Sequence, residues 1–281
     1  MSLKNQTAIV TGSTNGIGKK IAELLLKEGC NVVISSRTED KVTAVVTELK
    51  KDYGDAVTGH ATDVKELQSV QNLVNHTLDA FGSVEILVAN AGISSLYGPF
   101  SNLNSEELQR TTDTVIGTNL IGTINCVSAV LPTMISKKYG RIITLSGAGA
   151  DQKRPLAHHI VYSASKGGVI SFSTCLAKEL KEEQKIDDIK INVFSPGLIR
   201  TNMVANSQVV RNWISVEELQ QQASLVLEHL GTDLDESCKK VIPYASPSCK
   251  TSGTVFRGFS IKKMIFGGMK LKKAMKALKG N

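Results

Sequence analysis

A tyrosine and a lysine four residues apart, Tyr162 and Lys166, are the side chains of this sequence best suited to moving a proton. If the stretch around them is helical, both side chains leave one face about one turn apart. A phenol titrates near pH ~10, so it exchanges a proton at neutral pH only where a nearby positive charge stabilises the phenolate. An ammonium one turn away supplies that charge. An exposed tyrosine and lysine on a surface helix would have the same spacing.

A glycine-rich stretch near the start of the chain, residues 11–18, has the spacing of a phosphate-binding loop between a strand and a helix. Gly12 would allow the tight turn, Gly16 the approach of a pyrophosphate to the helix N-terminus, and Gly18 the close packing of helix on strand. A turn that only reverses the chain needs one glycine, so this spacing favours a dinucleotide. The predicted cofactor contacts here are Gly12, Ser13, Thr14, Asn15, Gly16, Ile17 and Gly18.

The end of the second predicted strand indicates which dinucleotide is bound. An acidic residue there would bind the ribose hydroxyls of NAD and repel a 2′-phosphate, but this chain has Ser36 and Arg37. A hydroxyl followed by a guanidinium suits the phosphate of NADP, so we predict NADP(H) as the cofactor. Arg37 as a solvated charge at the start of the next helix is the alternative. After the third strand, Asp63 and Val64 would contact the adenine, although Asp63 fits equally well as a helix N-cap.

Apolar runs rich in Val and Ile alternate with helix-like segments, which is typical of βαβ units on a parallel sheet. Strands are predicted at residues 7–11, 31–36, 56–60, 84–90, 140–146, 190–195 and 253–256, and helices at 16–29, 39–52, 65–81, 105–137 and 158–185. The predicted fold class is therefore α/β, a doubly wound parallel sheet. Ligands of such sheets bind beyond the carboxyl ends of the strands, where the motifs above fall.

The composition is that of one globular domain, with 41% apolar and 21% charged residues in a chain of 281. No apolar run approaches the ~18 residues that a membrane span needs, and the first residues do not resemble a signal peptide. We therefore expect a cytoplasmic protein. Five scattered cysteines without metal-ligand spacing predict reduced thiols and no metal site.

The net charge of +7 is concentrated at the carboxyl end of the chain. Residues 257–281 hold eight Lys or Arg and no Asp or Glu, whereas the remainder holds 25 basic and 26 acidic residues. We therefore divide the chain into a neutral domain, residues 1–256, and a basic extension, residues 257–281, and expect no binding of nucleic acid. In a helix, Met264, Leu271, Met275 and Leu278 would share one face. This pattern fits weak contact with an anionic membrane surface, docking on a protein surface, or partial disorder.

The motifs at residues 11–18, 90–92, 162–166 and 196–197 stand in an order and spacing that resembles the short-chain dehydrogenase/reductase family, over about residues 4–201. The resemblance implies a single Rossmann-fold subunit that binds a nicotinamide cofactor and moves hydride to or from a carbonyl or secondary alcohol. A homodimer or homotetramer is expected.

The resemblance also implies roles for individual residues. Tyr162 would donate the proton, Lys166 would lower the tyrosine pKa and hold the nicotinamide ribose, and Asn119 would anchor a water linked to the lysine. Further residues expected at the cofactor are Asn90, Ala91, Gly92, Pro196, Gly197, Ile199 and Thr201. Each has a plainer alternative, since Asn119 could be a helix-interior amide and Pro196-Gly197 an ordinary turn.

The chain departs from the family pattern at the serine that binds the substrate oxygen. Alignment of residues 141–145 places Gly147 at that position and Ser146 one residue early, and the interval to Tyr162 is longer than usual. Because Gly147 and Gly149 let the backbone turn, we predict that Ser146 reaches the substrate carbonyl. If it does not, the oxygen loses a donor, which typically costs a factor of ~10²–10³ in rate.

The leading hypothesis is an NADPH-dependent oxidoreductase acting on a carbonyl or secondary alcohol, with a 3-oxoacyl or other lipid-like ketone as the best-fitting substrate. Leu96, Tyr97, Phe100, Met203 and Trp213 predict a moderately apolar substrate pocket, or the packing of a lid. His158 and His159 receive no role. The rival hypothesis is a dinucleotide-binding sensor or scaffold with little turnover, which the glycine at position 147 favours.

Overall fold

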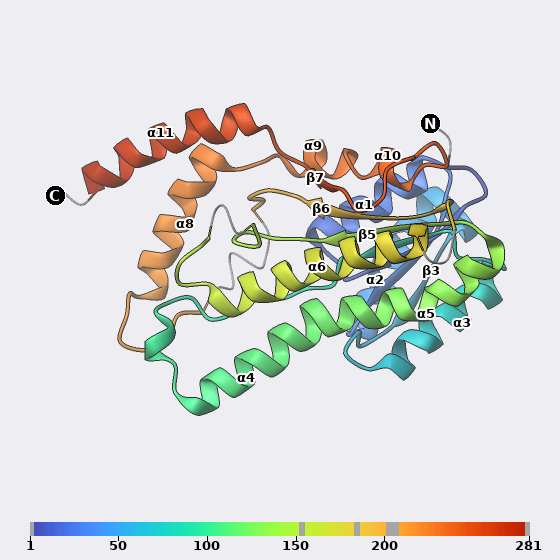
Figure 1. Cartoon of the computed structure of the whole chain (residues 1–281), viewed down its shortest axis with the longest axis horizontal. Coiled ribbons are helices and arrows are strands. Elements are labelled where there is room, and N and C mark those ends of the chain that lie inside the picture. The colour runs from blue at the N-terminus through green and yellow to red at the C-terminus, as the bar shows by residue number, and fades with distance from the viewer. Residues whose placement is uncertain (1–2, 152–154, 183–185, 201–207, 279–281) are drawn as a thin grey trace.

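The computed structural model describes residues 3–151, 155–182, 186–200 and 208–278, and their side chains except at 263 and 275–278. This part of the chain forms a parallel sheet of seven strands in the order β3-β2-β1-β4-β5-β6-β7 (Figure 1). The strands are β1 (Thr7–Thr11), β2 (Asn31–Ser36), β3 (Val57–Ala61), β4 (Ile86–Ala89), β5 (Gly140–Leu145), β6 (Ile189–Ser195) and β7 (Val255–Arg257). The predicted doubly wound α/β fold is confirmed, and the strand ends shift by two residues at most.

Helices cover both faces of the sheet. The helices are α1 (Gly16–Lys27), α2 (Glu39–Tyr53), α3 (Leu67–Phe81), α4 (Ser105–Ile116), α5 (Gly122–Lys137) and α6 (Ile160–Glu182), with short 3₁₀ turns at Gly54–Ala56 and Phe100–Asn102. Side chains from α1 and α2 join one apolar cluster with alternate strand residues such as Val10. Side chains from α3, α5 and α6 join a second cluster with the intervening residues such as Ile9. Because successive side chains of a strand point to opposite faces of the sheet, each buried strand contributes residues to both apolar clusters.

The winding of the sheet reverses between β1 and β4. β2 and β3 extend the sheet on one side of β1, whereas β4 to β7 extend it on the other. The connections that follow β1 and β4 therefore diverge, which opens a crevice at the carboxyl ends of these two strands. The glycine-rich loop and the stretch beginning at Asn90 border that crevice.

The segment predicted as one helix, residues 105–137, is helical throughout but changes pitch in its middle. A π-helical turn, η3 (Gly117–Ile121), separates α4 from α5. By length and apolar composition alone this helix could cross a membrane, but core helices satisfy the same criteria. Here Val127, Val130 and Met134 are buried in the second apolar cluster. The helix is therefore a core element, and its π turn carries the predicted site residue Asn119.

Helix α6 begins at Ile160, two residues later than predicted. The reason is the backbone of His158, which has a φ of 65°, outside the right-handed helical region. The chain therefore turns at His158 before α6 starts, and His159 sits at the beginning of the helix. This turn brings the His159 side chain into the protein, where it is 3% exposed.

Among the described residues after β6, the following helices were not predicted: α8 (Val216–Leu230), α9 (Leu234–Lys239) and α10 (Ile242–Ala245). The start of α8 carried a readable signal, because Ser215 and Glu218 form a capping box in which each side chain accepts the other residue's backbone N–H. Helix α8 stands beyond the carboxyl ends of the strands (Figure 1). Its Leu227 lines the crevice, so the helix forms one wall of the site.

The basic extension forms helix α11 (Ile261–Leu278), which crosses the carboxyl end of α8 (Figure 1). At the crossing, a Cβ on Gly267 would collide with the carbonyl oxygen of His229, whereas Gly268 has no neighbour within 4 Å. The predicted apolar face is the docked one, since Met264 and Leu271 are partly buried, and Met275 and Leu278 lie outside the described side chains. The domain limit at residue 257 stays a prediction, although β7 ends at that residue.

Candidate active site

The glycine-rich loop connects β1 to α1 in a conformation that requires its glycines. Gly12 and Gly16 have φ angles of 64° and 54°, in the left-handed region. A Cβ on Gly12 would lie 2.9 Å from the Cα of Ala91, and one on Gly18 would collide with the carbonyl oxygen of Gly12. The loop therefore packs tightly and leaves the first N–H groups of α1 open at the crevice. No side chain caps this helix, which makes its N-terminus suited to phosphate.

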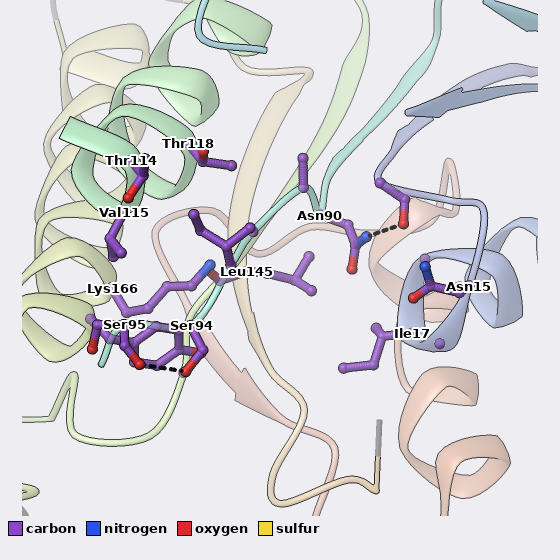
Figure 2. Close-up of a pocket in the computed structure, with 18 of the residues that line it drawn as sticks. Asn15, Ile17, Asn90, Ser94, Ser95, Thr114, Val115, Thr118, Leu145 and Lys166 are labelled. Carbon is purple, nitrogen blue, oxygen red and sulfur yellow. Dashed lines mark hydrogen bonds between the residues drawn. The ribbon is translucent and has the colours of Figure 1, made fainter. Parts of the chain in front are cut away.

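Asn90 ties the ends of β1 and β4 together where the sheet winding reverses. Its side-chain amide donates to the carbonyl oxygen of Thr11 at 2.8 Å and to that of Gly12 at 3.1 Å, and Figure 2 shows Asn90 bonded within the lining of the crevice. The hydroxyl of Thr11 in turn accepts from the backbone N–H groups of Asn90 and Ala91, both at 3.1 Å. These bonds fix the glycine-rich loop against the stretch that follows β4. Asn90, Ala91 and Gly92 all line the crevice, as predicted.

Ser13 has a different role from the one predicted. Its side chain is fully buried, donates to the carbonyl oxygen of Val10 at 2.6 Å and accepts from the N–H of Ser35 at 2.9 Å. Both capacities of the hydroxyl are thus used within the protein, and Ser13 does not line the crevice. It stabilises the loop conformation, whereas Thr14, Asn15, Gly16 and Ile17 lie at the surface of the crevice.

The end of β2 presents positive charge and an unpaired hydroxyl to the same crevice. Ser36 has a buried hydroxyl without a hydrogen-bond partner among the described residues. Arg37 is exposed beside it, and Lys41, in the first turn of α2, lines the crevice too. Lys41 was not predicted as a contact, although its spacing of four residues from Arg37 is a usable signal. An orphaned hydroxyl next to two cations fits a bound phosphate.

Neither interpretation of Asp63 matches the structure. Its carboxylate accepts from the N–H of Lys65 at 3.0 Å and closes a turn, but α3 starts later and its N-cap is Glu66. The side chain does not line the crevice either, which is bordered here by Thr62 and Val64. The turn places the backbone, and not the carboxylate, at the crevice. Val64 is confirmed at the crevice, and Thr62 is an addition.

Tyr162 and Lys166 leave one face of α6 as predicted, and both are buried, at 8% and 4% exposure. The Lys166 ammonium donates to the carbonyl oxygen of Leu145 at 3.0 Å, at the end of β5. Burial lowers the pKa of Lys166 to about 8 and raises the pKa of Tyr162 above its usual value, with the phenol of Tyr97 adding to the rise. Lys166 is not among the groups that shift the pKa of Tyr162 here, so the lowering of the tyrosine pKa by the lysine stays a prediction.

Asn119 connects the π turn to the stretch after β4 and to α6, the helix that carries Tyr162 and Lys166. Its amide exchanges two hydrogen bonds with the backbone of Ile93, at 2.8 and 3.0 Å. It also donates to the hydroxyl of Ser165 at 3.0 Å, which donates to the carbonyl oxygen of Tyr162. A Cβ on Gly92 would lie 3.2 Å from the Asn119 oxygen and 3.3 Å from the Lys166 nitrogen. Asn119 is therefore next to the lysine, behind the wall of the crevice.

Ser146 lines the crevice next to Gly147, just after β5. Its backbone N–H donates to the carbonyl oxygen of Phe194 at 2.9 Å, and no protein partner of its hydroxyl is found in the described part of the chain. A Cβ on Gly147 would collide with the hydroxyl of Tyr162. A serine at position 147 is therefore incompatible with the tyrosine in this position, which gives a physical reason for the glycine.

His159 completes a stack of three rings beside the tyrosine. The imidazole lies between Tyr97, at a centroid distance of 4.0 Å, and Tyr162, at 4.4 Å and an angle of 8°. Its Nε2 is 3.0 Å from the hydroxyl of Ser94, and its Nδ1 is buried with no partner among the described residues. Burial lowers the pKa of His159 to about 4, so the ring is neutral near pH 7. Residue type and spacing carry no signal for this contact, because the turn at His158 creates it.

The segment after β6 closes the crevice on the remaining side. Pro196, Gly197 and Ile199 line it as predicted, together with Leu198. Gly197 has a φ of 88°, and a Cβ there would lie 2.7 Å from the hydroxyl of Thr232, so a larger residue would be strained. The predicted contacts Thr201 and Met203 lie outside the described residues.

These elements border one continuous cavity of about 860 Å³. It runs from the glycine-rich loop, with Asn15 and Ile17, past Asn90 to Lys166, Ser94 and Ser95 (Figure 2). The described lining holds the cationic side chains Arg37, Lys41, Arg110 and Lys166 and no carboxylate. A long cavity that is lined by cationic side chains and has a buried tyrosine at one end is suited to an anionic cofactor and a small neutral reactant.

Comparison with known proteins agrees with this geometry. Residues 6–211 match the family described as short chain dehydrogenase. The chain belongs to this family. The 3-oxoacyl-[acyl-carrier-protein] reductase FabG of Buchnera aphidicola is 36% identical over 202 residues, which cover 72% of this chain and 77% of the relative. Chlorophyll(ide) b reductase NOL of Oryza sativa subsp. japonica is 32% identical over 228 residues, 79% of this chain and 64% of that longer protein.

A solved structure shows the same relationship in three dimensions. The 3-ketoacyl-(acyl-carrier-protein) reductase of Brucella melitensis, solved in complex with NADH, is 25% identical and superposes with a TM-score of 0.75, covering 91% of this chain and 97% of that chain. The short-chain dehydrogenase described here is thus an oxidoreductase of the class that acts on carbonyl or alcohol groups.

Proposed function

We propose that this short-chain dehydrogenase is an NADP(H)-dependent oxidoreductase that reduces a ketone, or oxidises the corresponding secondary alcohol. The observation that carries the proposal is the single cavity that joins the glycine-rich loop to Tyr162 and Lys166. One end can hold a dinucleotide and the other can hold a reactant next to a proton donor. When bound, the nicotinamide supplies or accepts the hydride.

The choice of NADP over NAD rests on the end of β2. A 2′-phosphate there would meet Arg37 and Lys41, and the buried hydroxyl of Ser36 would gain a partner. The described lining of the cavity contains no acidic side chain that would repel the phosphate. Charge-assisted hydrogen bonds of this kind each contribute about 1.5–3 kcal/mol.

Tyr162 is the proton donor in this proposal. Because burial keeps its phenol protonated at neutral pH, the side chain can give its proton to a substrate oxygen that gains negative charge. Lys166 uses one ammonium donor on the carbonyl oxygen of Leu145 and has further donors for a ribose hydroxyl. Asn119 holds the stretch around Ile93 and the start of α6 together, and Ser146 offers its hydroxyl to the substrate oxygen.

We infer a lipid-like ketone, such as a 3-oxoacyl thioester, as the substrate class. Apolar side chains border the catalytic end of the cavity, namely Leu96, Tyr97, Leu198, Ile199 and Leu227. The names of the similar FabG and 3-ketoacyl reductase proteins support the same class.

The test is consumption of NADPH with a panel of 3-oxoacyl thioesters, cyclic diketones and steroid ketones. Turnover of at least one substrate that falls about 10²-fold or more in Tyr162→Phe supports the proposal. Arg37→Ser should raise the dissociation constant of NADPH about 10-fold or more and leave that of NADH nearly unchanged. Equal effects of Arg37→Ser on the two cofactors would refute the preference for NADP.

The second candidate function is a dinucleotide-binding sensor with little turnover, which the missing hydroxyl at position 147 favours. The same measurements separate the two candidates. Tight binding of NADPH without turnover across the whole panel would support the sensor and count against the reductase.

We also propose a cytoplasmic location and weak contact of α11 with an anionic membrane surface. On the side away from α8, the helix exposes Ile261, Ile265, Phe266 and Met269 at 46–62%, and lysines flank them. Two copies meeting through this face would bring like charges together, which favours an anionic partner. Co-sedimentation with phosphatidylserine vesicles should fall in the double variant Ile265→Gln, Phe266→Gln, and equal sedimentation would dismiss the contact.

We propose a homodimer or homotetramer as the working form. Ile121 and Ile135 are 42% and 38% exposed along the helix that runs from α4 into α5, and an interface between subunits would bury them. Light scattering of the purified protein gives its mass. A monomer at micromolar concentration would refute this part of the proposal.

A further inference from the structure

The substrate oxygen needs a hydrogen-bond donor besides Tyr162, and position 147 cannot supply it. The family's hydroxyl is replaced there by Gly147, and even a Cβ at this position would collide with the phenol of Tyr162. A single missing donor to a developing oxyanion typically costs a factor of ~10²–10³ in rate. Ser146 lines the cavity and offers one hydroxyl to the substrate oxygen, and a second donor near the tyrosine would complete the replacement.

Ser94 is placed to be that donor. It lies in the stretch that follows β4, lines the cavity, and its hydroxyl is 3.0 Å from Nε2 of His159. The imidazole is parallel to the ring of Tyr162 at a centroid distance of 4.4 Å. The Ser94 hydroxyl is thus linked by one hydrogen bond to a ring that packs on the proton donor. Figure 2 shows Ser94 and Ser95 at the Lys166 side of the cavity.

The Ser94 hydroxyl can donate to the carbonyl oxygen of Ser95 or to the phenol oxygen of Tyr97, and a substrate oxygen can take the place of either acceptor. If His159 carries its proton on Nε2, it donates to the Ser94 oxygen, and the hydroxyl donates to the carbonyl oxygen of Ser95 at 3.3 Å. The other tautomer would satisfy only one of these two contacts and bury an unpaired Nδ1–H, so the Nε2–H tautomer is favoured. A bond of 3.3 Å is long for a hydroxyl donor, so exchanging it for a substrate oxygen costs little.

We propose that Ser94 donates a hydrogen bond to the substrate carbonyl oxygen, and that His159 positions and polarises it through its Nε2–H. The inference rests on the proposed reductase function. It makes Ser94 a further catalytic residue beside Ser146, and His159 a positioning residue. Donation from Nε2 draws electron density from the hydroxyl and makes Ser94 a stronger donor. The two tyrosines that enclose the imidazole hold its plane.

The kinetic test compares Ser94→Ala, Ser94→Thr and His159→Phe with the control Ser101→Ala, an exposed serine that does not line the cavity. Ser94→Ala should lower kcat about 10²-fold or more, while the dissociation constant of NADPH stays within about 2-fold. Ser94→Thr keeps the hydroxyl and should recover most of kcat. His159→Phe keeps the stacked ring but not the N–H, and should lower kcat about 10-fold. Ser94→Ala within about 3-fold of wild type would overturn the proposal.

A second measurement does not depend on turnover. Difference infrared spectra of acetoacetyl-N-acetylcysteamine labelled with ¹³C at the ketone, bound together with NADP⁺, report the hydrogen bonds to the ketone oxygen. The carbonyl band should lie at a higher frequency in Ser94→Ala than in the wild type, because a donor is lost. An unchanged band would overturn the role of Ser94 even if the reductase function stands. A wild-type protein that neither binds nor reduces any ketone would overturn both.

Discussion

Replacement of Lys166 by methionine should remove activity and at the same time leave the cofactor-free protein as stable as the wild type or more stable. Burial lowers the pKa of Lys166 from 10.5 to about 8. Holding this ammonium charged at pH 7 therefore opposes folding by about 3 kcal/mol. Methionine has a similar length and no charge, but it leaves the carbonyl oxygen of Leu145 without its donor, which costs about 1–3 kcal/mol. The expected net change is a gain of about 0–2 kcal/mol in the free energy of unfolding.

The pH dependence separates this reasoning from a simple packing effect. Between the folded pKa of about 8 and the unfolded pKa of 10.5, the unfolded chain binds the Lys166 proton and the folded protein does not. The free energy of unfolding therefore rises with pH because of this group. Between pH 7 and pH 9.5 the rise is about 2 kcal/mol. The rise should be absent in Lys166→Met, so the advantage of the variant shrinks as the pH increases.

The assay is unfolding in urea at pH 7 and at pH 9.5, with Lys178→Met as the control. Lys178 lies on the same helix with a side chain that is 72% exposed, so its replacement should change stability by less than about 0.5 kcal/mol at either pH. The buried thiols Cys30, Cys126 and Cys238, whose pKa values burial raises to about 12, act in the opposite direction but cancel between variant and wild type. A difference in unfolding free energy that does not change with pH would refute the reasoning.

Two glycine positions give further predictions. Gly147→Ser restores the family's residue but places a Cβ against the Tyr162 hydroxyl, so we expect kcat to fall about 10-fold or more while NADPH binding persists; a rise in kcat would contradict the structure. Gly267→Ala should lower the melting temperature because its Cβ meets the His229 carbonyl, whereas Gly268→Ala has open space around it and should stabilise α11 by up to ~1 kcal/mol. Equal shifts in thermal unfolding for these two variants would show that α11 does not dock on α8.

The sequence predicted the fold well because its signals are local. Each strand is a short apolar run, and the glycines of the loop at residues 11–18 indicate a turn. The order of elements along the chain therefore follows directly from the sequence. Helices α8, α9 and α10 were missed although Ser215 and Glu218 formed a readable capping box. Helix α9 packs on α1, α10 packs on β5 and α8 stands beyond the ends of the strands, and the pattern of strands gives no information about them.

At the site, residue types could be predicted but not the direction of every side chain. Tyr162, Lys166, Asn90 and Ser36 are where the motifs placed them. Ser13 was assigned to the cofactor because it lies within the loop, but only the register between β1 and β2 brings its hydroxyl to the N–H of Ser35.

The sequence by itself determined the chemistry on offer, namely a phenol, an amine, a phosphate-binding loop and a glycine where a hydroxyl is usual, because these depend on residue type and spacing. The tertiary structure decided how readily these groups are protonated and which residues contact them. Burial sets the pKa directions of Tyr162 and Lys166, and burial is a property of the packed molecule. The contact between His159 and Ser94 joins residues 65 positions apart, and it exists only because the turn at His158 and the stretch after β4 meet in space.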